Sequence, residues 1–125
     1  MIKLIFHILN VIFVILYIYP GSILGFLLFG DISRQPQLTS DLNIISLSSN
    51  HIYAFVLLSI LGMLSYPKFN KTLILYLFSI SFILELFHLV IPNRSFQFQD
   101  LFGNVVGVLV SILIVFIFNY WKKNE

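Results

Sequence analysis

Four ionisable side chains fall within one short stretch of a chain that is otherwise strongly apolar. The stretch ELFHLVIPNRSFQFQD contains Glu85, His88, Arg94 and Asp100. A carboxylate and an imidazole in apolar surroundings are proton-transfer candidates, because burial and neighbouring charges move their pKa values toward neutrality. A guanidinium suits phosphate or carboxylate, because its planar fork donates two parallel hydrogen bonds. We therefore take Glu85 and His88 as proton-transfer candidates and Arg94 as an anion contact.

Helical spacing places most polar or small residues on one face of each expected helix. Ser81, Glu85 and His88 recur at i, i+4 and i+7, so they share one side of a helix. An ionisable residue in hydrocarbon costs a few kcal/mol or more, so we expect such faces to point inward. The other sets with this spacing are Asp100, Asn104, Gly107 and Ser111; His51, Ser59, Gly62 and Tyr66; and Lys3, His7, Asn10 and Tyr17.

The composition indicates that these helices cross a membrane. Of the 125 residues, 59% are hydrophobic and 10% are charged, and the mean hydropathy is +1.00. About a quarter of an ordinary soluble domain is charged, and a helix needs about 20 apolar residues to cross a bilayer. We therefore predict one all-α integral membrane domain over residues 1–125, with four transmembrane helices at about 2–19, 51–66, 72–91 and 101–121. The first three end at prolines, which cannot continue a helical ladder.

The basic residues indicate an orientation for this four-helix arrangement. One side carries Lys3, Lys68, Lys71, Lys122 and Lys123, and the other carries Arg34 and Arg94. The positive-inside rule therefore predicts that both termini are cytoplasmic. The apolar segment GSILGFLLFGD after the first helix is too short to cross, so we expect it to lie at the outer interface or to dip in and return.

Position along the helices brings the polar groups to one depth. Glu85 lies about 10 Å from the outer end of its helix near Pro92, at about 1.5 Å per residue. His51 begins the preceding helix on the same side, and Asp100 and Asn104 lie in the first turns of the last one. These side chains should converge in the outer-leaflet half of the membrane.

Two interpretations of the cluster stay open. In the first, a polar pocket open to the outer interface binds a polar or anionic group, and the binding residues are Arg94, Asp100, Asn104 and His51. In the second, Arg94 pairs with Glu85 or Asp100, and the network only holds the helices together.

Other kinds of chemistry find little support. His51, His88 and Glu85 are metal-ligating residue types, but they are dispersed and form no H-E-x-x-H pattern, so we expect no metal site and no cofactor. The chain has no cysteine, which excludes thiolate chemistry and disulfides. No basic patch suggests nucleic acid, and no recognisable catalytic motif predicts an enzyme.

The sequence GNVVG, from Gly103 to Gly107, matches the GxxxG pattern of close helix contacts. We expect it to seat the last helix against another helix of the same chain. The pattern leaves a dimer or larger oligomer open.

The stretch ELFHLVIPNRSFQFQDLFGNVVG resembles the signature of the VanZ-like family of small membrane proteins. In that signature, a helix ending E-x-x-Q precedes a P-G-R segment, an Asp, and an N-x-x-G at the start of the next helix. The matching positions here are Glu85, Pro92, Arg94, Asp100, Asn104 and Gly107. Upstream, SSNHIYAFVLLSILG is similar to the family's D-K-x-x-H segment, with His51 as the matching histidine.

The chain also departs from that signature. His88 stands where the family usually has Gln, and Asn93 replaces the usual Gly before Arg94. Ser49 and Asn50 lack the Asp-Lys pair. His88 could replace the hydrogen bonds of the glutamine or introduce a titratable group.

The resemblance implies a multi-pass protein of the bacterial cytoplasmic membrane that is connected with the cell envelope. The family takes its name from a teicoplanin-resistance protein. We therefore expect an outer-leaflet pocket for a polar or anionic envelope component, such as a lipid-linked phosphate or a glycopeptide-type molecule, with the lipid bilayer as the surrounding partner. The alternatives are a structural or accessory protein whose polar cluster only fixes helix packing, and a small oligomeric transporter.

Overall fold

The fold was obtained as a computed structural model, which describes residues 1–39, 47–66 and 70–124. The described residues form five α-helices and no β-strand, which confirms the all-α class. The helices are α1 (Ile2–Ile18), α2 (Ile23–Phe29), α3 (Ser49–Ser65), α4 (Lys71–Phe87) and α5 (Phe98–Lys123). Lys68, one of the lysines that indicated the orientation, lies outside the described residues.

Helix α4 ends earlier than the sequence predicted. The prediction that it continues to about Ile91 was wrong, because the backbone N–H groups of His88, Leu89 and Val90 donate to carbonyls three residues back, at 3.0, 3.1 and 3.0 Å. Such tightening is common in a last helical turn, and Pro92 disfavours helical geometry in the residue before it. His88 therefore lies at the end of α4 and not one turn inside it.

Helix α5 begins before the predicted residue 101. It starts at Phe98, which places Asp100 in its first turn. A carboxylate there interacts favourably with the partial positive charge of the helix N-terminus. The last turn carries Lys122 and Lys123 beside the opposite end of the dipole. The charges at both ends of α5 therefore favour this longer helix.

A sharp bend separates α1 from α2. The helices meet at 86° across the break that contains Pro20 and Gly21. The Ser22 hydroxyl oxygen accepts a hydrogen bond from the Gly25 N–H at 2.9 Å and so caps the new helix. The short apolar segment after the first predicted span is thus a seven-residue helix that runs across the direction of α1.

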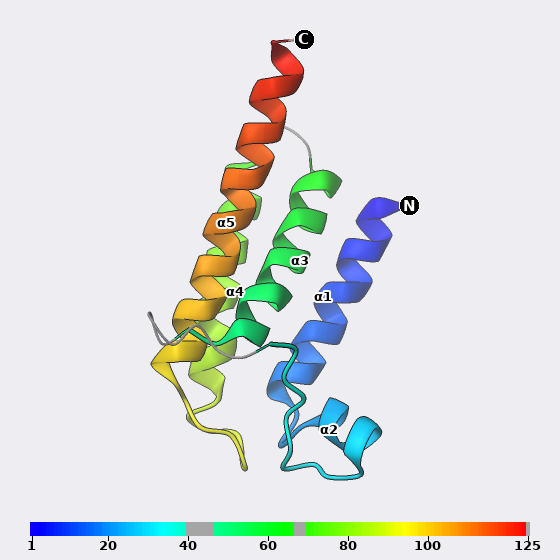
Figure 1. The fold of residues 1–125 in the computed structure, drawn as a ribbon, viewed down its shortest axis with the longest axis vertical. Coiled ribbons are helices and arrows are strands. Elements are labelled where there is room, and N and C mark those ends of the chain that lie inside the picture. Colours follow the sequence, from blue (N-terminus) through cyan, green and yellow to red (C-terminus); the bar gives the residue numbers. More distant parts are fainter. Residues whose placement is uncertain (40–46, 67–69, 125) are drawn as a thin grey trace.

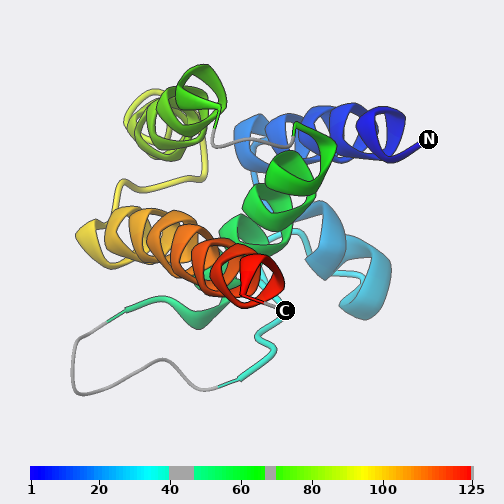
Figure 2. The ribbon, with the colours of Figure 1, turned by 90° about the horizontal axis from the view of Figure 1, so that it is seen from above.

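Helix α3 occupies the middle of the bundle. It packs most extensively against α5, and it also contacts α1 and α4 (Figure 2). Both termini lie at one end of the molecule, and α2 and the connection from α4 to α5 lie at the other (Figure 1). The bundle therefore has a terminal end and an opposite end, which we call the α2 end.

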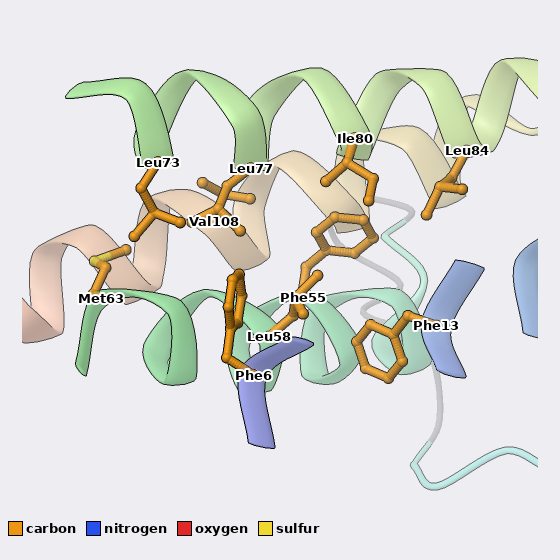
Figure 3. Close-up of a cluster of buried hydrophobic side chains, with 10 residues drawn as sticks. All are labelled: Phe6, Phe13, Phe55, Leu58, Met63, Leu73, Leu77, Ile80, Leu84 and Val108. Carbon is orange, nitrogen blue, oxygen red and sulfur yellow. The ribbon is translucent and has the colours of Figure 1, made fainter. Parts of the chain in front are cut away.

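The core is apolar and lies between the four long helices. Phe55 and Leu58 of α3 are fully buried, as are Leu77 of α4 and Val108 of α5. Phe6 and Phe13 bring α1 against this group, and Figure 3 shows their rings directed at α3. The core thus fixes the relative positions of the helices that carry the polar residues.

By length and composition, only some of the helices match the prediction of four transmembrane spans. Among the described residues, α5 alone is long and apolar enough to cross a bilayer, and α1 and α2 pass the same test only as a bent pair. Helix α3 is apolar but has 17 residues. Large apolar side chains nevertheless cover the outer faces of α1 and α5, including Val11 (59% exposed) and Leu113 (57% exposed).

Candidate functional site

Helix α3 begins, α4 ends and α5 begins at the α2 end (Figure 1). Polar side chains gather there. Glu85 and Asn104 are fully buried, and His88 is 4% exposed. His51 and Asp100 are half-buried beside them. Buried polar groups need hydrogen-bond partners, so the contacts of these five residues define the site.

Glu85 is the buried centre of the cluster. Its Oε1 accepts a hydrogen bond from the backbone N–H of Gln97 at 3.0 Å and lies 3.3 Å from His88 Nδ1. Its Oε2 has no hydrogen-bond partner among the described residues. Glu85 is thus held in place by one oxygen, while the other is left free.

His88 links α4 to α1. Its Nε2 lies 3.0 Å from the carbonyl oxygen of Tyr17, and a carbonyl only accepts, so Nε2 carries a proton. Its ring also stacks on the Tyr17 ring, with centroids 5.9 Å apart. In a neutral imidazole, Nδ1 would then present a lone pair to the Glu85 carboxylate. The close contact therefore calls for a further proton on one of the two residues, which suits the predicted proton-transfer candidates.

A second network joins α1, α3 and α5. Asn104 Oδ1 accepts from the Tyr17 hydroxyl at 3.0 Å and lies 2.9 Å from His51 Nδ1. The Asn104 side-chain amide donates to the Ser81 carbonyl at 3.2 Å, which fixes the orientation of the amide. On its other side, His51 Nε2 lies 3.6 Å from Asp100 Oδ2.

Arg94 does not make the predicted ion pair. Among the described residues it pairs with neither Glu85 nor Asp100; instead its Nε donates to the Tyr19 carbonyl at 3.2 Å and its Nη2 to the Leu16 carbonyl at 3.0 Å. The carbonyls of a last helical turn lack intrahelical partners and attract positive charge. Burial lowers the pKa of the Arg94 guanidinium from its ordinary value, but arginine stays charged in proteins.

Asn93 explains how Arg94 reaches that position. It is the one non-glycine residue of the described chain with a positive φ, at 60°. Glycine adopts this left-handed conformation freely, and asparagine is among the few other residues that tolerate it. The position where Asn93 replaces the usual Gly of the VanZ-like signature therefore keeps a glycine-type backbone.

The cluster opens into a polar cavity of about 230 Å³. His51, His88, Arg94 and Asp100 contribute its ionisable lining. Every other lining residue is also polar: Gln35, Gln37, Ser48, Asn50, Asn93, Ser95 and Gln97. Neither Glu85 nor Asn104 lines the cavity, but each contacts a side chain that does: Glu85 contacts His88, and Asn104 contacts His51.

Gly103 and Gly107 lie where α5 crosses α3. A Cβ at Gly103 would lie 2.8 Å from the Ser48 carbonyl oxygen, and a Cβ at Gly107 would lie 2.7 Å from that of Ile52. Both neighbours are main-chain atoms, one in the N-cap residue of α3 and the other within α3. The two glycines therefore allow the close approach that brings His51 to Asp100 and Asn104.

Two groups of the polar cluster, the Tyr17 hydroxyl and the Gln97 backbone N–H, were not among the predicted site residues. Tyr17 belonged to the polar face of the first helix, and its spacing was the signal that could have placed it beside His51 and Asn104. The Gln97 contribution is a backbone N–H, which has no signature in the sequence. Of the predicted polar faces, that of α1 turns inward only in part, because Lys3 and His7 are exposed.

Comparison with known proteins places these residues in a family context. A family model described as VanZ/LLP1 matches residues 4–119, a range that contains every residue lining the cavity. Neither curated proteins nor solved structures include a match to the chain.

Proposed function

Because the chain belongs to the VanZ/LLP1 family, we propose that it is a multi-pass protein of the bacterial cytoplasmic membrane that binds a polar or anionic component of the cell envelope. The binding site is the cavity at the α2 end. One observation carries this proposal: a cavity lined by polar residues lies at the end of a bundle whose outer faces are apolar.

In the proposed placement, α1, α3, α4 and α5 cross the membrane and α2 lies at its outer surface. Lys3, Lys71, Lys122 and Lys123 then face the cytoplasm, in agreement with the positive-inside rule. Helices α3 and α4 have 17 residues each and are about 25 Å long. This is a few Å less than the usual hydrocarbon thickness, and local thinning of the bilayer accommodates the difference.

Arg94 supplies the positive charge of the cavity. Its hydrogen bonds to the Tyr19 and Leu16 carbonyls use two N–H groups, and a guanidinium has five. The remaining donors can bind an anionic oxygen, and Asn93, Ser95 and Gln97 add uncharged polar groups beside them.

The size of the cavity narrows the choice of ligand. Pockets that enclose a whole drug-sized molecule measure about 300–1,000 Å³, and this cavity measures about 230 Å³. It suits a phosphate or a single polar headgroup better than an entire glycopeptide-type molecule. A lipid-linked phosphate, with its chain in the bilayer, is therefore the ligand that we favour.

A second function is favoured by a specific observation. Arg94 and His88 both donate to carbonyl oxygens of α1, which is what a structural or accessory protein would need to keep α1 in the bundle. In that case the polar cluster binds nothing and only fixes helix packing.

Native mass spectrometry of the protein extracted from bacterial membranes separates these functions. We expect anionic lipid to remain bound to the wild type and to be lost in Arg94→Gln. Arg34→Gln is the matched control, because Arg34 lies over the Phe29 ring, 4.0 Å from its centroid, and does not line the cavity.

Unfolding measured on the same samples completes the test. If Arg94→Gln and Arg34→Gln retain lipid equally per folded molecule, and Arg94→Gln only lowers the free energy of unfolding, the packing function is correct and the binding function is wrong.

A further inference from the structure

Three metal-ligating side chains from three different helices meet beside the cavity. They are His51 of α3, Glu85 of α4 and Asp100 of α5, and one ligand atom of each lies within 4.8 Å of the others. Their common depth predicted that they converge, but the sequence predicted no metal site, because the three residues are dispersed along the chain. The proton position on His51, its separation from Asp100 and the unpartnered oxygen of Glu85 together indicate that a cation fits between them.

The tautomer of His51 follows from its neighbours. The Asn104 amide nitrogen donates to the Ser81 carbonyl, so the atom facing His51 Nδ1 at 2.9 Å is the Asn104 oxygen. An amide oxygen only accepts, and therefore Nδ1 carries the proton. In the neutral ring, Nε2 then keeps a lone pair, which points toward Asp100.

The separation between His51 and Asp100 suits a cation between them. His51 Nε2 and Asp100 Oδ2 are 3.6 Å apart, which is longer than a hydrogen bond. Two ligands of a tetrahedral zinc ion, bound at about 2.0–2.2 Å, lie about 3.4 Å from each other. The pair is thus spaced like two ligands of one ion.

Glu85 supplies the third ligand. It is fully buried, and one of its oxygens is already held by Gln97 and His88 while Oε2 has no partner. A buried carboxylate oxygen without a hydrogen bond is unfavourable unless a cation neutralises it. This orphaned atom is an observation independent of the His51–Asp100 spacing.

We propose that His51 Nε2, Asp100 and Glu85 bind a divalent transition-metal ion, with Zn²⁺ as its representative. One imidazole with two carboxylates is a ligand set that zinc accepts, whereas Mg²⁺ and Ca²⁺ prefer oxygen ligands alone. The Asn104 oxygen holds the His51 N–H in the way that outer partners orient metal-bound histidines. His51 and Asp100 also line the cavity, so the remaining coordination position opens into it.

The ion would change the charge that the cavity presents. With the further proton that Glu85 and His88 share, the side chains of Glu85, His88, Arg94 and Asp100 together carry a formal charge of 0, and a divalent ion makes this +2. A phosphate oxygen could then complete the coordination, although binding of the metal does not depend on the proposed ligand.

Equilibrium binding of Co²⁺ and Zn²⁺ tests the site directly. The purified protein carries a tag without histidines and is stripped with a chelator, and bound metal is measured by elemental analysis and by Co²⁺ visible absorption. We expect one ion per chain in the wild type. His51→Gln, Glu85→Gln and Asp100→Asn should each weaken binding about tenfold or more, since even outer-partner changes have effects of that size.

His7→Gln is the matched control, because His7 bonds to the Tyr66 hydroxyl outside the site. It should bind metal as the wild type does. Absence of a bound ion from the wild type at micromolar Zn²⁺ would overturn the proposal, as would loss of the ion in His7→Gln. Circular dichroism of the metal-free variants separates lost ligands from lost folding, and retained binding in all three folded ligand variants also overturns it. No lipid is present in this measurement, so its failure leaves the lipid test unaffected.

Discussion

Replacing Gly107 with alanine should weaken the packing of α5 on α3. The added methyl carbon would lie 2.7 Å from the Ile52 carbonyl oxygen and 2.8 Å from Phe55 Cβ, whereas ordinary contacts begin at 3.4 Å. Neither neighbour is the end of a flexible side chain, so the helices must separate. Overpacking of this kind costs about 1–3 kcal/mol, and alanine returns about 1 kcal/mol of helix propensity. Taking the upper end of the clash, we expect a net loss of about 2 kcal/mol.

Gly62→Ala provides a comparison with the same chemical change. Its added carbon would lie 3.0 Å from Phe6 Cε2 and 3.4 Å from Leu73 Cδ1, and both are side-chain atoms that can move. The gain in helix propensity, about 1 kcal/mol, should then offset the clash. The two substitutions are thus expected to differ by about 2 kcal/mol, since propensity contributes equally to both.

Reversible unfolding in mixed micelles containing increasing dodecyl sulfate, followed by far-ultraviolet circular dichroism, measures both variants. A Gly107→Ala variant as stable as the wild type, or a Gly62→Ala variant that is the more destabilised of the two, would show that the contact between α5 and α3 is not as tight as described.

Three further outcomes are expected. Tyr17→Phe removes the hydroxyl that donates to Asn104, so unfolding should show a loss of about 1 kcal/mol; an unchanged midpoint would mean that this hydrogen bond contributes nothing. His88→Gln can still bond to Glu85, so the free energy of unfolding should change little. His88→Leu removes the contacts with Glu85 and with the Tyr17 carbonyl and should lower the free energy of unfolding by about 1–3 kcal/mol. Equal losses of stability in both variants would contradict this. A single cysteine at Ser95 should react with an impermeant reagent added to intact cells, while one at Asn124 should react only after lysis, and the reverse pattern would invert the proposed orientation.

The helices were largely predictable because their signals are local. Apolar runs that stop at Pro20, Pro67 and Pro92 specify where helices can and cannot continue. The polar faces followed from spacing alone, and Ser81, Asn104 and Ser111 are indeed fully buried. Boundaries were less predictable, since the tightened turn after Phe87 depends on hydrogen bonds that leave no trace in residue types.

The partner of Arg94 was predicted wrongly for a physical reason. Sequence reasoning compares side chains, and Glu85 and Asp100 were the obvious opposite charges. The actual acceptors are main-chain carbonyls at the end of α1. Every helix has such carbonyls at its C-terminus, and no residue type in the sequence indicates which of them will bind a side chain. The convergence of His51, Glu85 and Asp100 was predicted from their common depth, but the spacing of their ligand atoms was not, because it depends on how three helices cross and not on any one of them.

Helix α2 has a consequence for how a ligand reaches the cavity. Phe26, Leu27 and Leu28 are 60%, 71% and 65% exposed, and α2 runs nearly perpendicular to α1. In the proposed placement α2 would lie in the interface of the outer leaflet, with these side chains among the acyl chains. The Ser22 N–H donates to the Ile32 carbonyl at 2.7 Å. This bond connects the start of α2 to the segment that leads to Gln35 and Gln37, which line the cavity. The opening of the cavity would then stay at the depth of the lipid headgroups, whatever the bilayer thickness. Molecules would enter it laterally from the headgroup region of the outer leaflet and not from the centre of the bilayer.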